Sequence, residues 1–386
     1  MNLINPPAMD LFEPSAYPSL GLLYLAAVLK KAGHKCTYID FSEGLEVNDG
    51  VIPDIPQGIN LITVLQATYK SSLDTAKFLR DTGNGPIVIG GSQVSLIPDK
   101  AVRDFNSYAA VLGEAENVIV DVVNGNKAGI VYGGVIEDLD SIPYPDRDIL
   151  PLSKLRNLSG IHLDRYDNDG AATTMISSRG CPYSCAFCSK SPHTKYFRWR
   201  SAKNIIGEML NIWSEYAINH IRFVDDCFTA NTRRVFDLCS LLKPCNFYWL
   251  CITRADRVNA NLLKEMYAAG CREIHFGIES GSQRILDFMN KGETVEQYVK
   301  AISLAKRAGL IVKIFLMEKF PGETSADIEL TKEFVRRVQP DKFTLSKFVP
   351  LAGSQMSWTG EDYQFFYPEE ETELRFWLRS REWERK

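Results

Sequence analysis

The sequence predicts an α/β protein of two domains, an N-terminal doubly wound parallel sheet and a C-terminal partial β/α barrel. Short β-branched runs alternate with amphipathic stretches up to about residue 125, and six further alternations begin near residue 171. The segment between them, residues 126–170, is rich in proline and polar turn formers. With 386 residues, the chain is long enough for two full hydrophobic cores.

In the first segment, the β-branched runs predict five strands and the stretches between them predict four helices. The expected strands are 1–4, 36–40, 60–65, 86–90 and 108–112, and the expected helices are 20–31, 71–81, 99–105 and 115–123. Strands that alternate with helices join into parallel sheets through right-handed crossovers. We therefore expect a Rossmann-type domain over residues 1–125, which would bind a ligand at the carboxyl ends of its strands.

In the second segment, residues 171–355, the same alternation predicts six β/α units. The expected strands are 173–178, 221–225, 247–252, 273–277, 312–317 and 342–349, and the expected helices are 202–213, 232–242, 262–269, 282–289, 295–308 and 325–338. The fifth of these helices has clear boundaries, since Thr294 and Gln297 form a capping box and Gly309 ends it. Six units predict an incomplete (β/α)6 barrel.

Two shorter segments complete the predicted organisation. Residues 126–170 form a linker that contains Gly133 and Gly134. Residues 356–386 form a short helical extension, in which Leu374, Trp377 and Leu378 have the spacing of one helix face.

The composition excludes several classes of protein. The net charge of -4 and the isoelectric point near 5.9 give no basic footprint of a nucleic-acid binder, so we do not expect a nucleic acid as partner. No apolar run approaches the ~18 residues of a membrane span, and the first residues do not resemble a signal peptide. The nine cysteines, an odd number, do not form a secreted disulfide framework. We therefore expect a cytoplasmic protein with no membrane partner.

The most informative motif is a cysteine loop that directly follows the first barrel strand. Cys181, Cys185 and Cys188 have C-x3-C-x2-C spacing. Three thiolates from one loop can bind a [4Fe-4S] cluster and leave its fourth iron open for a substrate, whereas an electron-transfer cluster uses a fourth cysteine. Two alternatives are a structural zinc site with His193 as the fourth ligand and a set of unligated core thiols.

With Phe187 just before the last cysteine, the loop resembles the cluster loop of the radical S-adenosylmethionine (SAM) enzymes. Five further segments resemble the cobalamin-binding (B12-binding) subgroup of these enzymes: Ile221–Phe228, Trp249–Asp256, Ile274–Gly281, Met289–Thr294 and Phe320–Thr324. The resemblance covers about residues 1–355. It implies a [4Fe-4S] cluster held by the three cysteines, SAM, cobalamin, and an electron donor such as flavodoxin or ferredoxin.

The resemblance also implies which residues at the barrel rim bind SAM: Phe187, Asp225, Asp226, Arg254, Glu279 and Ser280. The aspartates would accept hydrogen bonds from the methionine ammonium group, and Arg254 would pair with the carboxylate. Each residue type has a structural alternative. The aspartates could cap the following helix, Arg254 could pair with Asp256, and Phe187 could pack in the core.

The resemblance places cobalamin between the first sheet and the barrel rim, at the carboxyl ends of the strands. The residues there are Leu65, Gln66, Gly90, Gly91, Ser92, Gln93, Gly113 and Glu114. Glycine at such places lets a bulky ligand approach the backbone, and it equally makes tight turns. One departure is that the chain has only five histidines and no Asp-x-His-x-x-Gly motif. This permits a cobalt without a protein ligand, and equally a domain that has lost the cofactor.

The resulting hypothesis is a radical SAM methyltransferase that methylates an unactivated carbon of a small-molecule or peptide substrate. The cofactors would carry out the difficult chemistry, while the protein would position them and exclude water and oxygen. One alternative is a radical rearrangement, cyclisation or bond cleavage in which cobalamin assists or is absent. An alternative from another class is a non-catalytic zinc-binding protein. The sequence identifies neither a catalytic side chain nor the substrate.

Overall fold

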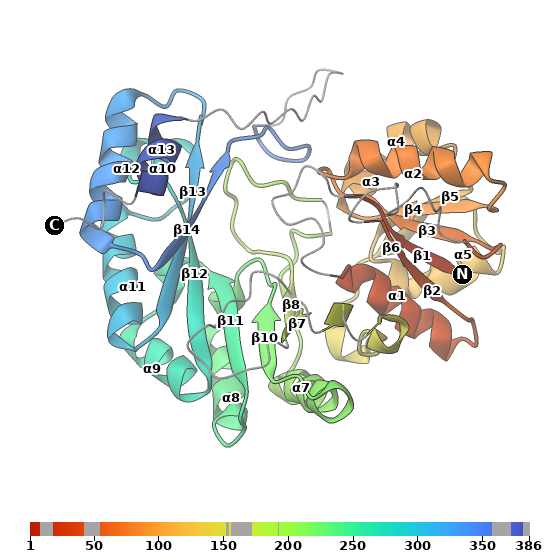
Figure 1. Ribbon diagram of the computed structural model, residues 1–386, viewed down its shortest axis with the longest axis horizontal. Helices are drawn as coiled ribbons and strands as arrows, with labels where there is room; N and C mark the ends of the chain where they lie inside the picture. Colours follow the sequence, from red (N-terminus) through yellow and green to blue (C-terminus); the bar gives the residue numbers. More distant parts are fainter. Residues whose placement is uncertain are drawn as a thin grey trace. The chain divides into compact units, whose positions relative to one another are not determined.

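The computed structural model describes residues 1–7, 18–41, 55–151, 154–155, 172–191, 193–356 and 372–380. The chain forms two compact units (Figure 1). The first unit contains the described residues up to 155, residues 172 and 173, and Lys190–Arg198. The second contains Thr174–Ser189 and the described residues from Trp199 onward. Each unit is built around its own six-stranded sheet, which confirms the predicted α/β class and the order of the two architectures.

The sheet of the first unit has the strand order β2-β1-β3-β4-β5-β6, and all neighbouring strands are parallel. Its strands are β1 (Asn2–Asn5), β2 (Thr37–Asp40), β3 (Asn60–Thr63), β4 (Ile87–Gly90), β5 (Ala109–Gly113) and β6 (Gly129–Gly134). Its helices are α1 (Leu20–Lys31), α2 (Tyr69–Asp81), α3 (Ser92–Leu96), α4 (Pro98–Phe105) and α5 (Ile119–Val123). This is a doubly wound order in which the direction of winding reverses between β1 and β3.

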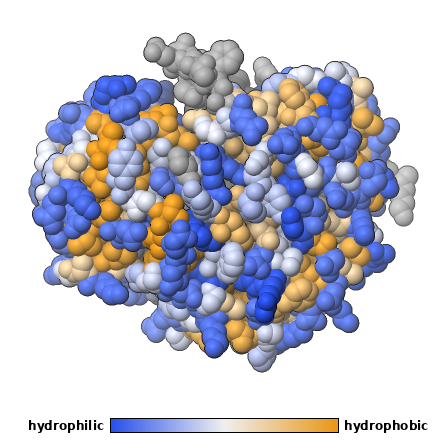
Figure 2. All heavy atoms as spheres, turned by 180° about the vertical axis from the view of Figure 1, so that it is seen from behind, coloured by the Kyte–Doolittle hydropathy of each residue, from blue (hydrophilic) through white to orange (hydrophobic). Residues whose placement is uncertain are grey.

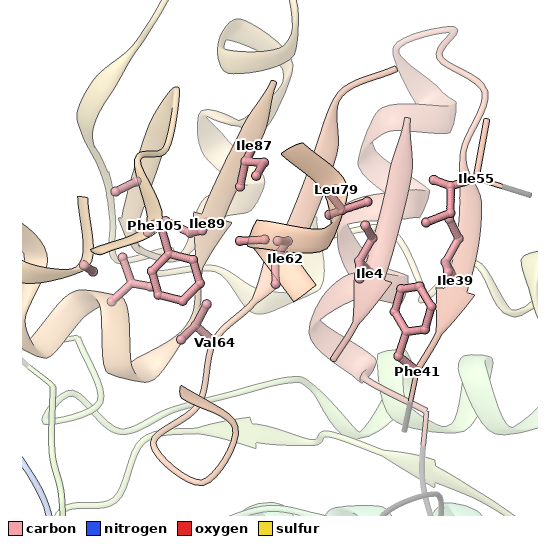
Figure 3. Packing of buried hydrophobic residues seen from close by; sticks show 14 of the residues in the cluster. Ile4, Ile39, Phe41, Ile55, Ile62, Val64, Leu79, Ile87, Ile89 and Phe105 are labelled. Atoms are coloured by element: carbon pink, nitrogen blue, oxygen red, sulfur yellow. The ribbon is translucent and has the colours of Figure 1, made fainter. Parts of the chain in front are cut away.

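Helices cover both faces of this sheet because its strands are apolar on both sides. On one face, Ile4, Ile62 and Ile89 of β1, β3 and β4 pack with Leu79 of α2 and Phe105 of α4 (Figure 3). All five side chains are at most 2% exposed. On the opposite face, α1 and α5 contribute a second apolar core (Figure 1). The two cores fix the sheet and so hold the carboxyl ends of its strands in place.

Strand β6 differs from the sequence prediction, which assigned its residues to the linker. The Gly133–Gly134 pair suggested a turn, but these glycines instead let an edge strand approach β5 closely. A Cβ atom at Gly133 would have no room against the carbonyl oxygen of Glu114, and Gly134 has a φ of 72°. The register of the pair shifts between Leu112 and Gly113. The first unit therefore extends past β6, and residues 152–153 and 156–171 of the predicted connection and its end lie outside the described part of the chain.

The sheet of the second unit has the strand order β14-β13-β12-β11-β10-β7, and it curves as a partial barrel with helices on its outer side (Figure 1). Its strands are β7 (Ala172–Met175), β10 (His220–Phe223), β11 (Tyr248–Thr253), β12 (Cys271–Glu279), β13 (Ile311–Glu318) and β14 (Lys342–Lys347). The short strands β8 (Ser178–Arg179) and β9 (Arg198–Trp199) pair separately. The helices are α7 (Ala202–Tyr216), α8 (Thr232–Leu242), α9 (Ala260–Ala268), α10 (Gln283–Phe288), α11 (Val295–Arg307), α12 (Ser325–Val338) and α13 (Glu373–Ser380).

Local signals in the sequence define several of these helices. The predicted capping box of Thr294 and Gln297 is present at α11, and Thr324 forms a similar box at α12. In α13, the three residues with helical spacing, Leu374, Trp377 and Leu378, are all buried. The rest of the expected extension, residues 357–371 and 381–386, lies outside the described residues.

The described helices include none that is long and apolar enough to cross a membrane. The face of the molecule in Figure 2 carries hydrophilic residues interspersed with smaller apolar areas. Single exposed apolar side chains are normal on a protein surface.

Candidate functional site

The cysteine loop follows β8, and its three cysteines are half-buried. The segment after α10 holds this loop in place. The backbone N–H of Ala186 donates to the carbonyl of Met289 at 2.8 Å. The side-chain amide of Asn290 donates to the carbonyl of Ser184 at 2.9 Å. The two loop residues in these contacts, Ser184 and Ala186, flank Cys185. Residues 289 and 290 therefore fix the path of the loop around this cysteine.

The chemistry of the loop fits an iron–sulfur cluster better than zinc. Within the described residues, no three His, Cys, Asp or Glu side chains converge closely enough to form a ready metal site, and this holds for either metal. His193, the fourth ligand of the zinc alternative, belongs to the first unit, where its ring lies against Gly113. Residues 181–188 themselves contain three thiols and no imidazole, which is the donor set of a cluster with one open iron.

Asp225 anchors the start of the loop. Its carboxylate accepts hydrogen bonds from the backbone N–H of Ser177 at 2.7 Å and from the hydroxyls of Ser177 and Ser178 at 2.5 Å each. Arg234 of α8 lies 3.7 Å from the same carboxylate. Because Asp225 is 2% exposed, these contacts commit its charge to positioning the residues that lead into the cysteine loop.

Asp226, by contrast, is exposed. Neither aspartate caps the following α-helix, because the N-cap of α8 is Asn231, whose side chain accepts from the backbone N–H of Arg234. Of the two neighbouring carboxylates, Asp226 is the one that a ligand could reach. A SAM-binding role for either remains a prediction.

Arg254 follows β11 and lies beside the cysteine loop. Its Nη1 atom is 3.8 Å from the sulfur of Cys185, and its guanidinium carbon lies 3.9 Å from the ring centroid of Tyr183. Its Nε atom also pairs with Asp256 at 3.0 Å, the alternative partner that the sequence indicated. Burial opposes its charge, but the hydrogen bond to Asp256 and the charge of Glu293 outweigh burial and raise the pKa of Arg254. A permanent cation thus faces one of the three thiols.

Glu279 ends β12 in a left-handed conformation, with a φ of 67°. Its Oε1 atom lies 3.1 Å from the ammonium nitrogen of Lys291, whose side chain is 6% exposed. Burial acts to lower the pKa of Lys291, but the charges of Glu279, Glu293 and Cys185 outweigh it, and the pKa is raised. The left-handed backbone conformation of Glu279 is strained, and strained residues of this kind are typical of functional positions.

The remaining two residues predicted to bind SAM pack into the protein. Ser280 is 0% exposed, and its hydroxyl accepts from the backbone N–H of Ser282 at 3.1 Å. Phe187 is half-buried against an apolar cluster that includes Met289 and Phe320. The ring of Phe187 also lies 5.6 Å from the nitrogen of Lys291. Phe187 therefore has a core contact and still borders the polar rim.

The carboxyl ends of β3 and β4 have features that fit a large polar ligand. Two buried polar atoms, Nε2 of Gln66 and Oε1 of Gln93, have no hydrogen-bond partner among the residues that the structure describes. Gly91 has a φ of 112°, and a Cβ atom there would lie 2.6 Å from the carbonyl oxygen of Val64. Unpaired buried polar atoms are costly unless a ligand or water satisfies them. Leu65 and Ser92, beside them, are exposed.

The end of β5 is occupied differently. One carboxylate oxygen of Glu114 accepts from the backbone N–H of Ile136 at 2.5 Å and from Nη1 of Arg198 at 2.8 Å. Arg198 donates also to the carbonyl of Ile136 at 2.6 Å. The Glu114 and Arg198 side chains are 11% and 7% exposed, so this pair fastens the segment Lys190–Arg198 to the first unit. Gly113, with a φ of 84°, leaves no room for a Cβ beside His193.

The structure thus brings Cys185, Phe187, Arg254 and Glu279 to one rim of the barrel sheet. It uses Asp225 and Ser280 mainly for internal contacts. The sequence did not single out Lys291, although it lies in the segment Met289–Thr294. The available signal was a lysine in a short turn between two predicted helices, and only the fold shows that it points at Glu279.

Comparison with protein families agrees with this arrangement. Residues 175–335 match the Radical SAM superfamily, and residues 14–123 match the B12 binding domain. The first range contains strands β10 to β13 of the barrel sheet, and the second contains strands β2 to β5 of the doubly wound sheet.

Similar proteins are known as well. An uncharacterized methyltransferase of Pyrococcus horikoshii is 30% identical over 367 residues, which cover 88% of this chain and 77% of that protein. The anaerobic magnesium-protoporphyrin IX monomethyl ester cyclase of Rubrivivax gelatinosus is 24% identical, with 88% of this chain and 66% of that protein covered. The solved structure of the radical SAM methyltransferase TsrM from Kitasatospora setae, with cobalamin and a [4Fe-4S] cluster bound, has a TM-score of 0.70 at 15% identity. It covers 92% of this chain, and the match spans 73% of that chain.

Proposed function

The chain belongs to the radical SAM enzymes that carry a cobalamin-binding domain, and we propose that it methylates an unactivated carbon of a small-molecule or peptide substrate. One observation carries the proposal. A three-cysteine loop at the rim of a radical SAM barrel occurs in the same chain as a B12-binding domain, and a 30% identical relative is named a methyltransferase. Together these two domains suit the delivery of a methyl group to a carbon made reactive by a radical.

The cofactors of this family are a [4Fe-4S] cluster, SAM and cobalamin. When bound, the cluster and SAM supply a 5'-deoxyadenosyl radical, and cobalamin supplies a methyl group. In this chain Cys181, Cys185 and Cys188 would hold the cluster. A reduced flavodoxin or ferredoxin is the proposed electron donor.

The residues of the chain would then position SAM. Asp225 holds the start of the cysteine loop and would thereby orient the three cysteines that hold the cluster. Asp226 is the exposed acceptor for an ammonium group, and Arg254 is the cation for a carboxylate. Glu279 presents its carboxylate at the end of β12, and the ring centroid of Phe187 lies 5.6 Å from the Lys291 nitrogen that pairs with Glu279. Charges fixed in advance at a partly buried rim orient a charged cofactor without reorganisation.

For cobalamin, the support lies at β3 and β4. The unpaired atoms of Gln66 and Gln93 are an amide donor and an amide acceptor, which suit the amide side chains around a corrin ring. Gly90 and Gly91 allow a bulky group to approach the backbone. Glu114 is already bound to Arg198, so we propose that it shapes this end of the sheet rather than contacting the cofactor directly.

The test is a product count on protein reconstituted without oxygen, with iron, sulfide, SAM and hydroxocobalamin. Methylation yields S-adenosylhomocysteine together with 5'-deoxyadenosine. A rearrangement, cyclisation or cleavage yields 5'-deoxyadenosine without S-adenosylhomocysteine and would overturn the methyl-transfer proposal.

A matched pair of cysteine variants tests the site itself. Cys185→Ala should lose cluster assembly and SAM cleavage, because it removes one of three cluster ligands. Cys245→Ala, which alters another half-buried cysteine of the same unit, should keep both. Cleavage of SAM by the Cys185→Ala protein at the wild-type rate would show that the loop is not the cluster site.

A further inference from the structure

Lys291 brings a buried positive charge to the barrel rim, and no cofactor contact proposed above accounts for it. Its side chain is 6% exposed, and its nitrogen lies 3.1 Å from Glu279. A buried ammonium is costly to desolvate, and an apolar side chain of similar volume often stabilises a protein as well or better. Packing alone therefore gives no reason for a lysine at this position.

The surrounding chain is shaped to admit this charge. A Cβ atom at Gly277 of β12 would lie 3.2 Å from the Lys291 nitrogen and 2.8 Å from Oε1 of Glu279. Glycine at residue 277 thus leaves the space that the ion pair occupies. The nitrogen also lies 5.6 Å from the ring centroid of Phe187, which is in the cysteine loop. The turn that carries Lys291 also holds the cysteine loop, because the carbonyl of Met289 accepts a hydrogen bond from the backbone N–H of Ala186.

The position of this charge matters for electron entry. Arg254 lies 3.8 Å from the sulfur of Cys185 and pairs with Asp256 at 3.0 Å, as Lys291 pairs with Glu279 at 3.1 Å. Lys291 is a second cation near the loop, and its ammonium and the Arg254 guanidinium both act on the carboxylate of Glu293. A cluster gains a negative charge when it is reduced, so a fixed cation nearby stabilises the reduced form more than the oxidised form.

We propose that Lys291 is a positioning residue whose charge favours reduction of the cluster. Its ammonium group, fixed between Glu279 and the ring of Phe187, raises the reduction potential of the cluster held by the cysteine loop. This inference rests on the proposed function, because it requires a cluster at Cys181, Cys185 and Cys188. Lys291 would act on the cluster through the electric field of its charge. In the test reaction one electron passes from dithionite to the oxidised cluster, and no bond to the protein forms or breaks.

The magnitude follows from the charge. A unit charge about 10 Å from the added electron, at an effective dielectric constant of about 20, changes the equilibrium constant for reduction about tenfold. For one electron, a tenfold change is about 59 mV. Lys291→Met in the reconstituted full chain should make the cluster about tenfold harder to reduce, whereas Lys291→Arg should stay within about threefold of wild type.

The experiment is a dithionite titration followed by the EPR signal of the reduced cluster, in the absence of SAM. Lys332→Met is the matched control, because the Lys332 side chain is 7% exposed and forms ion pairs with Glu329 and Glu373, away from the loop in α12 and α13. It should shift the equilibrium less than twofold. A shift in Lys291→Met no larger than in this control would overturn the inference.

A second variant decides the matter if Lys291→Met does not assemble a cluster. Glu279→Gln removes the negative partner and should make the cluster easier to reduce, a change of opposite sign. An unchanged or lowered potential in Glu279→Gln would also overturn the inference. If the wild-type protein binds no [4Fe-4S] cluster, the proposed function fails. If the cluster forms but its reduction potential does not change on substitution of Lys291, only the inference about Lys291 fails.

Discussion

Replacement of Asp225 by asparagine should loosen the base of the cysteine loop. The carboxylate accepts three hydrogen bonds from Ser177 and Ser178 and lies 3.7 Å from Arg234. Hydrogen bonds to a charged group contribute about 1.5–3 kcal/mol each. Asparagine retains one acceptor oxygen and loses the charge next to a buried guanidinium. We therefore expect the free energy of unfolding of the second unit to fall by about 3 kcal/mol.

Urea titration followed by tryptophan fluorescence measures this change, because all six tryptophans lie at residue 199 or later. Ser178→Ala should cost about 1.5 kcal/mol, since it removes one of the three hydrogen bonds. Asp226→Asn is the control for an adjacent but exposed carboxylate and should stay within about 0.5 kcal/mol of wild type. An Asp225→Asn protein as stable as wild type, but weak in SAM binding, would refute the anchoring role and favour direct contact with the methionine ammonium group.

Three further predictions concern other parts of the chain. Burial lowers the pKa of His275, so the unfolded chain binds a proton at this residue before the folded chain does. The free energy of unfolding should therefore fall as the pH drops below about 6.5. His275→Gln should flatten this dependence of the unfolding free energy on pH in urea titrations between pH 7 and 5, and an unchanged dependence would contradict it. Arg198→Met should weaken hydrogen-exchange protection of the first sheet by about 3 kcal/mol, because it leaves the buried carboxylate of Glu114 unpaired. Adding Glu114→Gln should cost little more, because the two side chains act as a pair. Additive losses in the double variant would mean that they are not coupled. Gly91→Ala should weaken hydroxocobalamin binding at least tenfold in equilibrium dialysis. Gly21→Ala is the control, because the space around residue 21 is open, and it should bind as wild type does. Equal affinities of the two variants would exclude the backbone at residue 91 from the site.

Much of the fold follows from local sequence signals. Helices α1, α8 and α12 have the predicted bounds, because each joins a clear apolar stripe to a defined start or end. Strand β6 and helix α3 were not predicted. The glycines of β6 are typical of turns, and their use in a close approach to β5 depends on a neighbour distant in sequence. The five-residue α3 is too short to show a helical period.

The candidate site divides in the same way. Spacing alone indicated the three cysteines, because their ligand pattern lies within one loop. The contacts of Asp225 and Arg254 depend on how separate strands meet, so the sequence could place both residues at the rim but could not distinguish anchoring from ligand binding. Lys291 was missed for a related reason. A lysine in a turn is ordinarily solvated, and its burial follows from the glycine at residue 277 of another element.

The most direct test of the central claim is the EPR spectrum of the anaerobically reconstituted and reduced chain, recorded with and without SAM. A cluster held by three cysteines has an iron that SAM can bind, so the spectrum of a [4Fe-4S] cluster should appear and should change when SAM is added. A protein that shows no such spectrum, or one whose spectrum is the same with and without SAM, would contradict the account.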